Sequence, residues 1–168
     1  MIKKMKIFLI GMPGSGKTSL GKKLADNLKL SFIDLDEVIE KKEQLTIPGI
    51  FEQHGEDYFR NAESKVLKKT GLAEDDFVMA TGGGTPCFFD NMDFMNEAGM
   101  TIYLKISKKE LTIRLGKNAS IRPMLQEEGV LHDKVSELLQ TRCRYYEKAD
   151  VTCESDRLTT KDLKTALR

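Results

Sequence analysis

The sequence predicts an α/β fold in which a parallel sheet of five strands lies between two layers of helices. Short apolar runs alternate with amphipathic helical segments along the chain, a pattern typical of strand–helix–strand units with right-handed crossovers. A glycine-rich loop with phosphate-binding spacing joins the first apolar run to the first helical one. The 168 residues are enough for one domain with a sizeable core. Together these features predict a three-layer αβα domain.

The expected elements follow one another with few gaps. Five apolar runs have the length of strands: residues 6–10, 31–34, 77–81, 101–106 and 151–154. Helices are expected over residues 18–28, 56–70 and 131–148 and after the last strand, because apolar residues recur there at helical spacing. Gly71 would end the second of these helices. Because no repeat or low-complexity linker divides the chain, residues 1–168 are predicted to form a single domain.

Two polar segments interrupt this alternation. Residues 44–55 contain Pro48, Gly49 and Gly55, and residues 116–129 are polar with a single proline. Long polar loops in compact α/β domains are often lids or substrate loops. Composition alone is equally compatible with tolerated surface insertions.

The composition is that of a soluble globular protein, with 40% hydrophobic and 32% charged residues. The formal net charge of +1 supplies no global field for nucleic acid or an anionic membrane, so neither is an expected partner. No apolar run approaches the ~18 residues of a membrane span, and the run 7–10 is too short for an export signal. Three cysteines without metal-binding spacing (Cys87, Cys143 and Cys153) favour a reducing compartment, so we expect a cytoplasmic protein.

Residues 11–18, Gly-Met-Pro-Gly-Ser-Gly-Lys-Thr, match the phosphate-binding pattern GxxxxGK[ST] between a strand and a helix. The glycines allow backbone N–H groups to face an anion, and the helix N-terminus adds its positive dipole end. Lys17 would reach the β- and γ-phosphates, and the Thr18 hydroxyl would bind Mg²⁺. Because Pro13 has no N–H, the nucleotide-binding residues are expected to be Gly14, Ser15, Gly16, Lys17, Thr18 and Ser19.

A phosphate-binding loop alone does not identify a reaction, since GTPases, motor ATPases and small-molecule kinases share it. The chain has no base-reading motif of the NKxD type, which a GTPase should carry, and it is short for a motor. A small-molecule kinase is therefore favoured.

The carboxylate that binds the metal must come from an unusual place. Many proteins with this loop carry an aspartate at the end of a second apolar strand, but here that strand runs into Gly82, Gly83 and Gly84. Asp34 and Asp36 are two apart, so in an extended chain both would point the same way. One could support the metal and the other could act on a hydroxyl group. Alternatively, Asp36 only caps a helix that begins at Glu37.

Arginine is rare in this chain, with seven arginines against twenty lysines, and should mark sites that need its planar fork. Helical phasing places Arg60 and Glu63 on or next to an apolar face, which predicts an oriented guanidinium or, alternatively, a purely structural buried pair. The same phasing turns Arg142 inward and Arg144 toward solvent. Arg122, in the second polar segment, would close over a transferring phosphate or else be solvated.

A nucleotide loop with two inward arginines indicates a second anionic ligand, which we expect to carry a carboxylate or phosphate together with a hydroxyl group. A tight turn explains one glycine of the triplet Gly82–Gly84 but not three. We therefore predict that the triplet forms the floor of the acceptor site, with Gly83 and Gly84 as the closer contacts.

An ordered set of motifs runs along the chain: GMPGSGKT, FIDLD, IFEQHGEDYFRNAE, the triple glycine, RPML and RCRYYEKAD. Through this set the chain resembles the shikimate kinase family almost end to end. The resemblance implies a P-loop kinase of the nucleoside-monophosphate-kinase type, with a substrate-binding region at about residues 34–62 and a lid at about 114–129. It also implies Mg²⁺-dependent transfer of the γ-phosphate of ATP to the 3-hydroxyl of shikimate, on the route to chorismate and the aromatic amino acids. We expect a monomer whose partners are ATP and shikimate.

The resemblance also implies roles for single residues. On the nucleotide side, it implies that Lys17 and Thr18 hold phosphate and Mg²⁺ and that Asp34 supports the metal. Arg122 would be the lid arginine, and Arg114 would stack on adenine. On the acceptor side, Asp36 would bind the hydroxyl as a candidate base, Arg60 and Arg142 would bind the shikimate carboxylate, Glu63 would position Arg60, and Phe51 and Phe59 would line the pocket.

The chain departs from the family pattern at two places. It has Arg142-Cys-Arg-Tyr-Tyr146 where the family usually has RxPLY, and it has SDRLTTK, with Arg157 and no proline, after the last strand.

Two alternatives to a shikimate kinase remain open. One is a kinase for another small hydroxy acid, such as gluconate, and the other is a nucleotide-dependent binding module without transfer activity.

Overall fold

A parallel sheet of five strands forms the centre of the protein, in the order β2-β3-β1-β4-β5. The computed structural model describes residues 4–73, 75–118 and 128–168. The strands are β1 (Lys6–Ile10), β2 (Ser31–Asp34), β3 (Phe77–Ala80), β4 (Met100–Lys105) and β5 (Val151–Glu154). All four neighbouring pairs are parallel. The predicted α/β fold with a five-stranded parallel sheet is confirmed, and the predicted strands differ from the observed ones by at most one residue at an end.

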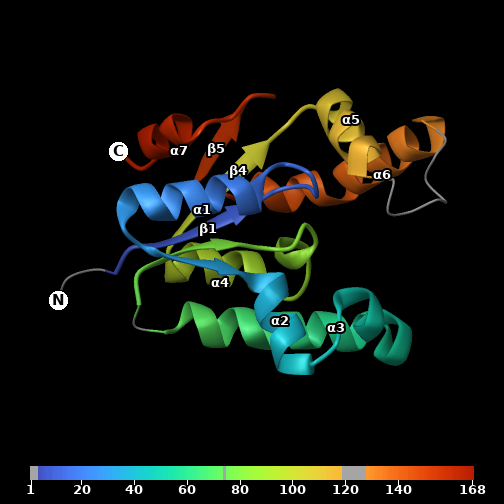
Figure 1. Ribbon diagram of the computed structural model, residues 1–168, viewed down its shortest axis with the longest axis horizontal. Coiled ribbons are helices and arrows are strands. Elements are labelled where there is room, and N and C mark those ends of the chain that lie inside the picture. Colours follow the sequence, from blue (N-terminus) through green and yellow to red (C-terminus); the bar gives the residue numbers. More distant parts are fainter. Residues whose placement is uncertain (1–3, 74, 119–127) are drawn as a thin grey trace.

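Helices connect the strands and cover both faces of the sheet (Figure 1). Their bounds are α1 (Lys17–Leu28), α2 (Leu35–Glu43), α3 (Ile47–Gly71), the short 3₁₀ helix η1 (Thr85–Cys87), α4 (Asn91–Ala98), α5 (Lys108–Asn118), α6 (Glu128–Tyr146) and α7 (Thr160–Ala166). Within the described ranges, no helix is long and apolar enough to cross a membrane.

The alternation of side chains along β1 shows why the sheet is covered on both sides. Ile7 and Leu9 pack in one buried cluster with residues of α1 and α7. Phe8 and Ile10 pack in a second cluster with residues of α3, α4, α5 and α6. Successive strand residues point to opposite faces, so a strand that is apolar throughout requires helices on both sides. Two cores around one sheet make the three layers.

The prediction of an irregular segment over residues 44–55 is confirmed for residues 44–46 and is wrong from Ile47 on. Helix α3 begins at Ile47, and the Thr46 hydroxyl caps it by accepting a hydrogen bond from the Gly49 N–H at 3.2 Å. Pro48 lies in the first turn, where a missing N–H removes no helical hydrogen bond. Gly55 interrupts the helix with a φ of 82°, and the part after it matches the predicted helix 56–70, which ends at Gly71. Pro48 lies at the start of this helix and Gly55 at its kink. Both residue types are also common in loops, so composition does not distinguish the two cases.

Helices α4 and α5 are absent from the expected elements, and α2 is present among them only through the alternative of a helix that begins at Glu37. Helix α5 is rich in charged residues and buries Leu111 completely on its inner side, so its helical spacing is weak in the sequence. It takes up the first residues of the predicted loop 116–129, and α6 takes up its last two. The intervening residues 119–127 lie outside the described residues.

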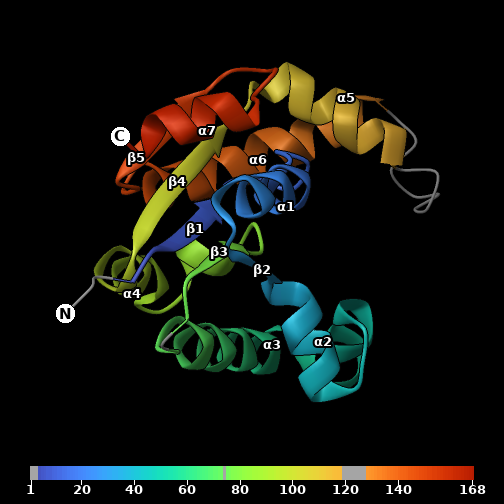
Figure 2. The same cartoon turned by 60° about the vertical axis from the view of Figure 1, so that its left-hand side comes forward.

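The arrangement leaves the carboxyl ends of the strands between two groups of helices. Figure 2 shows α2 and α3 at the β2 edge of the sheet and α5 and α6 on the side of β4 and β5. In open parallel sheets ligands bind at the carboxyl ends of the strands. The phosphate-binding loop after β1, Asp34 at the end of β2 and the triple glycine after β3 lie at these carboxyl ends.

Candidate active site

The phosphate-binding loop connects β1 to α1 at the carboxyl ends of the strands. Gly14 and Gly16 have positive φ angles of 82° and 93°, and Gly16 is the left-handed residue that immediately precedes α1. The Ser15 N–H donates to the Met12 carbonyl at 3.1 Å. This backbone conformation in front of a helix N-terminus is that of an anion-binding loop.

Lys17 is buried within the loop itself. Its Nζ donates to the carbonyls of Gly11 and Met12 at 2.8 and 2.9 Å. Burial lowers the pKa of Lys17 to about 8, while the nearby carboxylates of Asp36 and Asp34 act in the opposite direction. The ammonium group is therefore held inside the loop, close enough to the carboxylates of Asp34 and Asp36 to interact with their charges.

The two aspartates lie where β2 passes into α2. Asp34 ends the strand and caps the helix, because its Oδ1 accepts from the Asp36 N–H at 3.1 Å. Both the extended-chain argument for the pair and the alternative that Asp36 is the cap are therefore wrong, since Asp36 lies in the first turn of α2. The Thr18 hydroxyl donates to Asp34 Oδ2 at 2.9 Å. A hydroxyl and a carboxylate in contact are hard oxygen ligands of the kind Mg²⁺ prefers.

The surroundings of Asp36 disfavour its ionised form. Burial, together with the charges of Asp34 and Glu63, raises the pKa of Asp36 to about 6, and Lys17 only partly offsets them. A carboxyl group with a pKa near the working pH suits proton transfer.

Arg60 and Glu63 face inward on α3, as the helical phasing predicts. Arg60 is 9% exposed and Glu63 is 1% exposed, and Arg60 Nη1 lies 2.9 Å from Glu63 Oε1. The guanidinium also lies over the Phe88 ring, 4.1 Å from its centroid, and over the Phe59 ring at 5.0 Å. Phe51 stacks on Phe59 with ring centroids 4.7 Å apart. The Arg60 fork is thus held from several sides.

The triple glycine lies where four parts of the chain meet. A methyl group at Gly82 would lie 3.2 Å from Glu63 Oε2 and 3.3 Å from Asp36 Oδ1. At Gly83 it would lie 2.6 Å from the Pro13 ring and 3.0 Å from Arg142 Nη1, and at Gly84 2.6 Å from Arg60 Nη2. Each glycine therefore makes room for a different neighbour: α2 and α3 at the first, the phosphate loop and α6 at the second, and Arg60 at the third.

The long helix α6 separates its two arginines in the predicted way. Arg142 is half-buried and lies against Gly83, whereas Arg144 is exposed. One turn later, the fully buried Tyr146 donates a hydrogen bond to the Gly83 carbonyl at 2.5 Å. Burial raises the pKa of Tyr146 well above its usual range, so this hydroxyl stays protonated. Helix α6 thereby holds the backbone of the triplet and places Arg142 beside it.

Arg114, on α5, contacts both the phosphate loop and the segment after β5. Its Nη1 donates to the Gly14 carbonyl at 3.3 Å, and its Nη2 donates to the Asp156 carbonyl at 2.6 Å. Glu110 accepts from its Nε at 2.8 Å. The guanidinium thus ties the phosphate loop to the segment after β5. Arg122, the predicted lid arginine, lies outside the described residues.

Three buried polar residues near the triplet were not predicted as site residues: Ser64, Thr85 and Asn91. They form a continuous set of hydrogen bonds that ends on Glu63. Thr85 directly follows the triplet at a strand end, which is a usable signal in the sequence. Ser64 and Asn91 carry no such signal, because only the packing of α3 against α4 brings them together.

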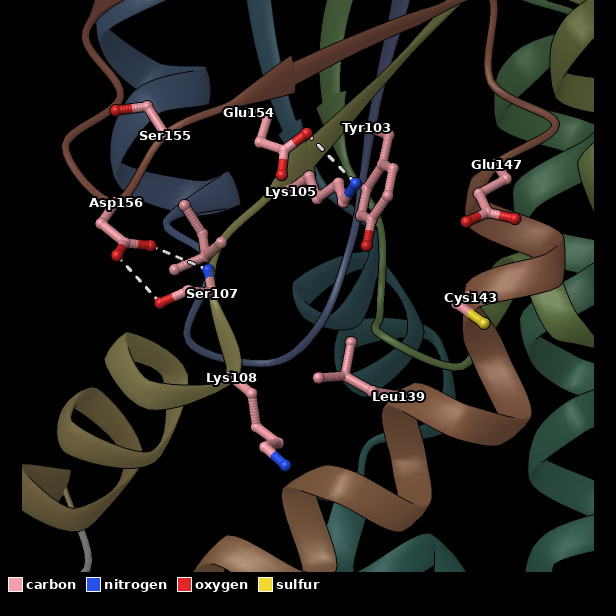
Figure 3. Close-up of a pocket in the computed structure, with 11 residues that line it drawn as sticks. Tyr103, Lys105, Ser107, Lys108, Leu139, Cys143, Glu147, Glu154, Ser155 and Asp156 are labelled. Carbon is pink, nitrogen blue, oxygen red and sulfur yellow. Dashed lines mark hydrogen bonds and ion pairs between the residues drawn. The ribbon is translucent and has the colours of Figure 1, made fainter.

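A separate cavity of about 380 Å³ lies at the carboxyl ends of β4 and β5, against α6 (Figure 3). Two polar contacts border it, the Lys105–Glu154 ion pair and the hydrogen bonds between Ser107 and Asp156. None of the predicted site residues lines it. The lining residues are Tyr103, Lys105, Ile106, Ser107, Lys108, Leu139, Cys143, Glu147, Glu154, Ser155 and Asp156.

The fold and the phosphate loop define the class of this protein: it is a P-loop kinase, and the inward arginines around the triplet suit a small anionic acceptor. The family model described as shikimate kinase matches residues 13–167. The chain therefore belongs to the shikimate kinase family, as the sequence resemblance indicates.

Individual relatives agree with this assignment. The shikimate kinase of Parabacteroides distasonis is 42% identical over 157 residues, which cover 92% of this chain and 90% of that protein. The crystal structure of the Bacteroides thetaiotaomicron shikimate kinase superposes with a TM-score of 0.87 at 37% identity, covering 97% of this chain and 94% of that one. The Acinetobacter baumannii shikimate kinase in complex with shikimate gives a TM-score of 0.85 at 35% identity, covering 98% and 90%.

Proposed function

We propose that this protein transfers the γ-phosphate of ATP to the 3-hydroxyl of shikimate, giving shikimate 3-phosphate and ADP. Membership of the shikimate kinase family supports the reaction. The observation that carries it in this chain is the buried Arg60–Glu63 pair beside the triple glycine. A guanidinium held by a buried carboxylate and two aromatic rings is pre-organised to receive a ligand carboxylate.

On the nucleotide side, we assign the phosphates to the loop residues Gly14, Ser15, Gly16, Lys17, Thr18 and Ser19. The left-handed glycines and the start of α1 support this assignment. Arg114 is proposed to stack on adenine, because its contacts to Gly14 and Asp156 hold the guanidinium plane beside the loop. Arg122 is proposed to neutralise charge on the transferring phosphate.

On the acceptor side, we assign the shikimate carboxylate to Arg60 and Arg142 and the ring to the backbone of Gly82–Gly84. Phe51 and Phe59, stacked on each other, are proposed to wall the pocket. Glu63 is proposed to position Arg60 through their ion pair.

Mg²⁺ fits the pair formed by Thr18 and Asp34, which already lie within hydrogen-bonding distance. The hydroxyl would bind the ion directly, and the carboxylate would support it through the ion's water shell. When bound, the ion neutralises charge on the phosphate oxygens.

The proposed step is an in-line transfer in which the protein mainly positions and neutralises. The shikimate 3-oxygen forms a bond to the γ-phosphorus while the bond to the ADP oxygen breaks. The hydroxyl proton passes to Asp36, whose raised pKa suits it as an acceptor.

We further propose that residues 1–168 act as one kinase domain, with a substrate-binding region at about 34–62 and a lid at about 114–129. The near-neutral charge supports a protein that binds no nucleic acid and no membrane. The three cysteines without metal-binding spacing support a cytoplasmic location, and we propose that the protein is a monomer.

The deciding experiment measures ADP release with ATP and Mg²⁺ in the presence of shikimate, gluconate or nucleoside monophosphates. We expect release that depends on shikimate and disappears in the Lys17→Ala variant, which controls for contaminating kinases. A preparation that binds ATP but releases ADP equally with and without shikimate would overturn the proposal.

A further inference from the structure

Glu63 has two buried hydrogen-bond partners, one on each carboxylate oxygen. Its Oε1 accepts from Arg60 Nη1 at 2.9 Å, and its Oε2 accepts from the Thr85 hydroxyl at 2.8 Å. Glu63 is 1% exposed and Thr85 is 0% exposed. A buried carboxylate needs donors on both oxygens, so the Thr85 hydroxyl fixes the plane of the carboxylate that holds Arg60.

Thr85 is itself held in place. Its carbonyl accepts from Asn91 Nδ2 at 2.9 Å, and Asn91 Oδ1 accepts from the Ser64 hydroxyl at 2.7 Å. Asn91 is 0% exposed and Ser64 is 8% exposed. These bonds join α3, η1 and α4, and they return to the same helix that carries Arg60. The distance between the Arg60 fork and the triplet is therefore set by a closed hydrogen-bonded network.

The geometry at Gly84 shows why this distance matters. The Arg60 guanidinium lies so close to Gly84 that a methyl group there would be 2.6 Å from Nη2. The Phe88 ring also lies against the guanidinium, with its centroid 4.1 Å away. Because the Arg60 guanidinium is so closely surrounded, it can keep its binding orientation only while the Glu63 carboxylate keeps its present orientation.

We propose that Thr85 is a positioning residue of the acceptor site, which orients the Arg60 guanidinium through Glu63 and so sets the affinity for the shikimate carboxylate. This inference rests on the proposed function, since it assumes that Arg60 binds that carboxylate. Thr85 does not touch the acceptor in this scheme. Its role is specific to the acceptor and leaves the nucleotide side unchanged.

The test replaces Thr85 with valine, which keeps the shape and removes the hydroxyl. We expect the shikimate KM, and the shikimate Kd measured by calorimetry, to rise roughly tenfold, because a buried carboxylate oxygen loses its donor. The ATP KM should change less than about twofold. Thr85→Ser, which restores the hydroxyl, should return the shikimate KM to within about threefold of the wild type.

Thr101→Val is the matched control. Thr101 is also 0% exposed, and its hydroxyl donates to Asn96 Oδ1 at 2.6 Å at the amino end of β4, the opposite edge of the sheet. It should lower thermal stability without changing the shikimate KM. If the two valine variants lose stability equally and neither changes the KM, Thr85 is only structural and the proposal fails.

A double-mutant cycle with Arg60→Lys identifies the route of the effect. If Thr85 acts through the Arg60 fork, Thr85→Val should weaken shikimate binding by less than about twofold in the Arg60→Lys background. Full additivity would overturn the proposal. Should Thr85→Val fold poorly, Thr85→Ala supplies the same comparison, with ADP binding as the check on folding.

The two proposals fail in different ways. A wild-type protein that does not bind shikimate would contradict the proposed function. A wild-type protein that binds shikimate, together with a Thr85→Val variant that binds it equally well, would contradict only the role of Thr85.

Discussion

Asp36, the proposed proton acceptor, illustrates how a site residue can act against stability. It lies in the first turn of α2 among the charges of Asp34 and Glu63, and its pKa is raised to about 6 from a usual 3.8. The folded protein therefore binds a proton at Asp36 more tightly than the unfolded chain does. Ionised Asp36 destabilises the fold, and the effect is complete above pH 6 and absent below about pH 4.

Asp36→Asn should therefore stabilise the protein while it removes activity. At pH 8 we expect a gain of about 1–2 kcal/mol, allowing for the partial exposure of the group, and the gain should vanish toward pH 4. Turnover should fall at least ~10²-fold, because the candidate base is lost, while ATP binding persists. Thermal unfolding at several pH values and a turnover assay check both parts. Near-normal turnover would remove Asp36 from the mechanism.

The two arginines near the end of α6 allow a matched comparison at the residue scale. Arg142→Ala should raise the shikimate KM roughly 10- to 100-fold, because a charge-assisted contact to the ligand carboxylate is lost. Arg144→Ala removes the same charge from the exposed side of the helix and should change the KM less than about twofold. Steady-state kinetics on both variants decide the point, and equal effects would refute the inward assignment of Arg142.

At the scale of elements, the segment Gly82–Gly84 determines how closely its neighbours approach. The loop after β1, the helices α2, α3 and α6, and the triplet itself converge there because none of the three residues carries a side chain. Interiors are close-packed, so an added methyl group must displace something. Which neighbour is displaced differs along the triplet, and the kinetic consequence should differ with it.

Gly84→Ala should displace the Arg60 fork, so we expect the shikimate KM to rise roughly tenfold while the ATP KM is unchanged. Gly83→Ala should push against Pro13 in the phosphate loop as well as Arg142, and both KM values should rise. Separate titrations of ATP and shikimate distinguish these cases. An unchanged ATP KM in Gly83→Ala would show that the phosphate loop absorbs the methyl group.

At the scale of the whole molecule, the amino ends and the carboxyl ends of the strands have different roles. An aspartate links β4 to β5 at each of these ends, which we call the amino edge and the carboxyl edge. Asp150 accepts from the Thr101 N–H at 2.9 Å at the amino edge. Asp156 accepts from the Ser107 N–H at 2.8 Å at the carboxyl edge (Figure 3), and its carbonyl also holds Arg114. Ligands bind at the carboxyl edge in such sheets.

Asp150→Ala and Asp156→Ala should have different effects: the first should change only stability, and the second should also change ATP binding. Asp150→Ala should lower Tm by a few degrees, because the buried Thr101 loses hydrogen-bond partners, with kcat and both KM values unchanged. Asp156→Ala should also raise the ATP KM, since it loosens the segment that positions Arg114. Thermal unfolding and kinetics test the pair together. An altered ATP KM in Asp150→Ala would contradict the separation of the two edges.

Much of this protein follows from local pattern. The strands, the phosphate loop and the inward faces of Arg60 and Arg142 were predictable, because strand and helix periods and the GxxxxGK[ST] spacing are properties of neighbouring residues. Family resemblance supplied the candidate roles. The helix over residues 47–54 escaped prediction because its Pro48 and Gly49 are equally common in loops.

The tertiary structure was needed wherever distant segments meet. Three contacts depend on how helices pack around the sheet. The Thr18 hydroxyl meets Asp34, Glu63 shares its carboxylate between Arg60 and Thr85, and the glycines of the triplet make room for side chains of other elements. Such contacts join residues up to a hundred positions apart, as Arg114 and Gly14 show. They are set by the filling of space and the pairing of buried polar groups, which no local period in the chain records.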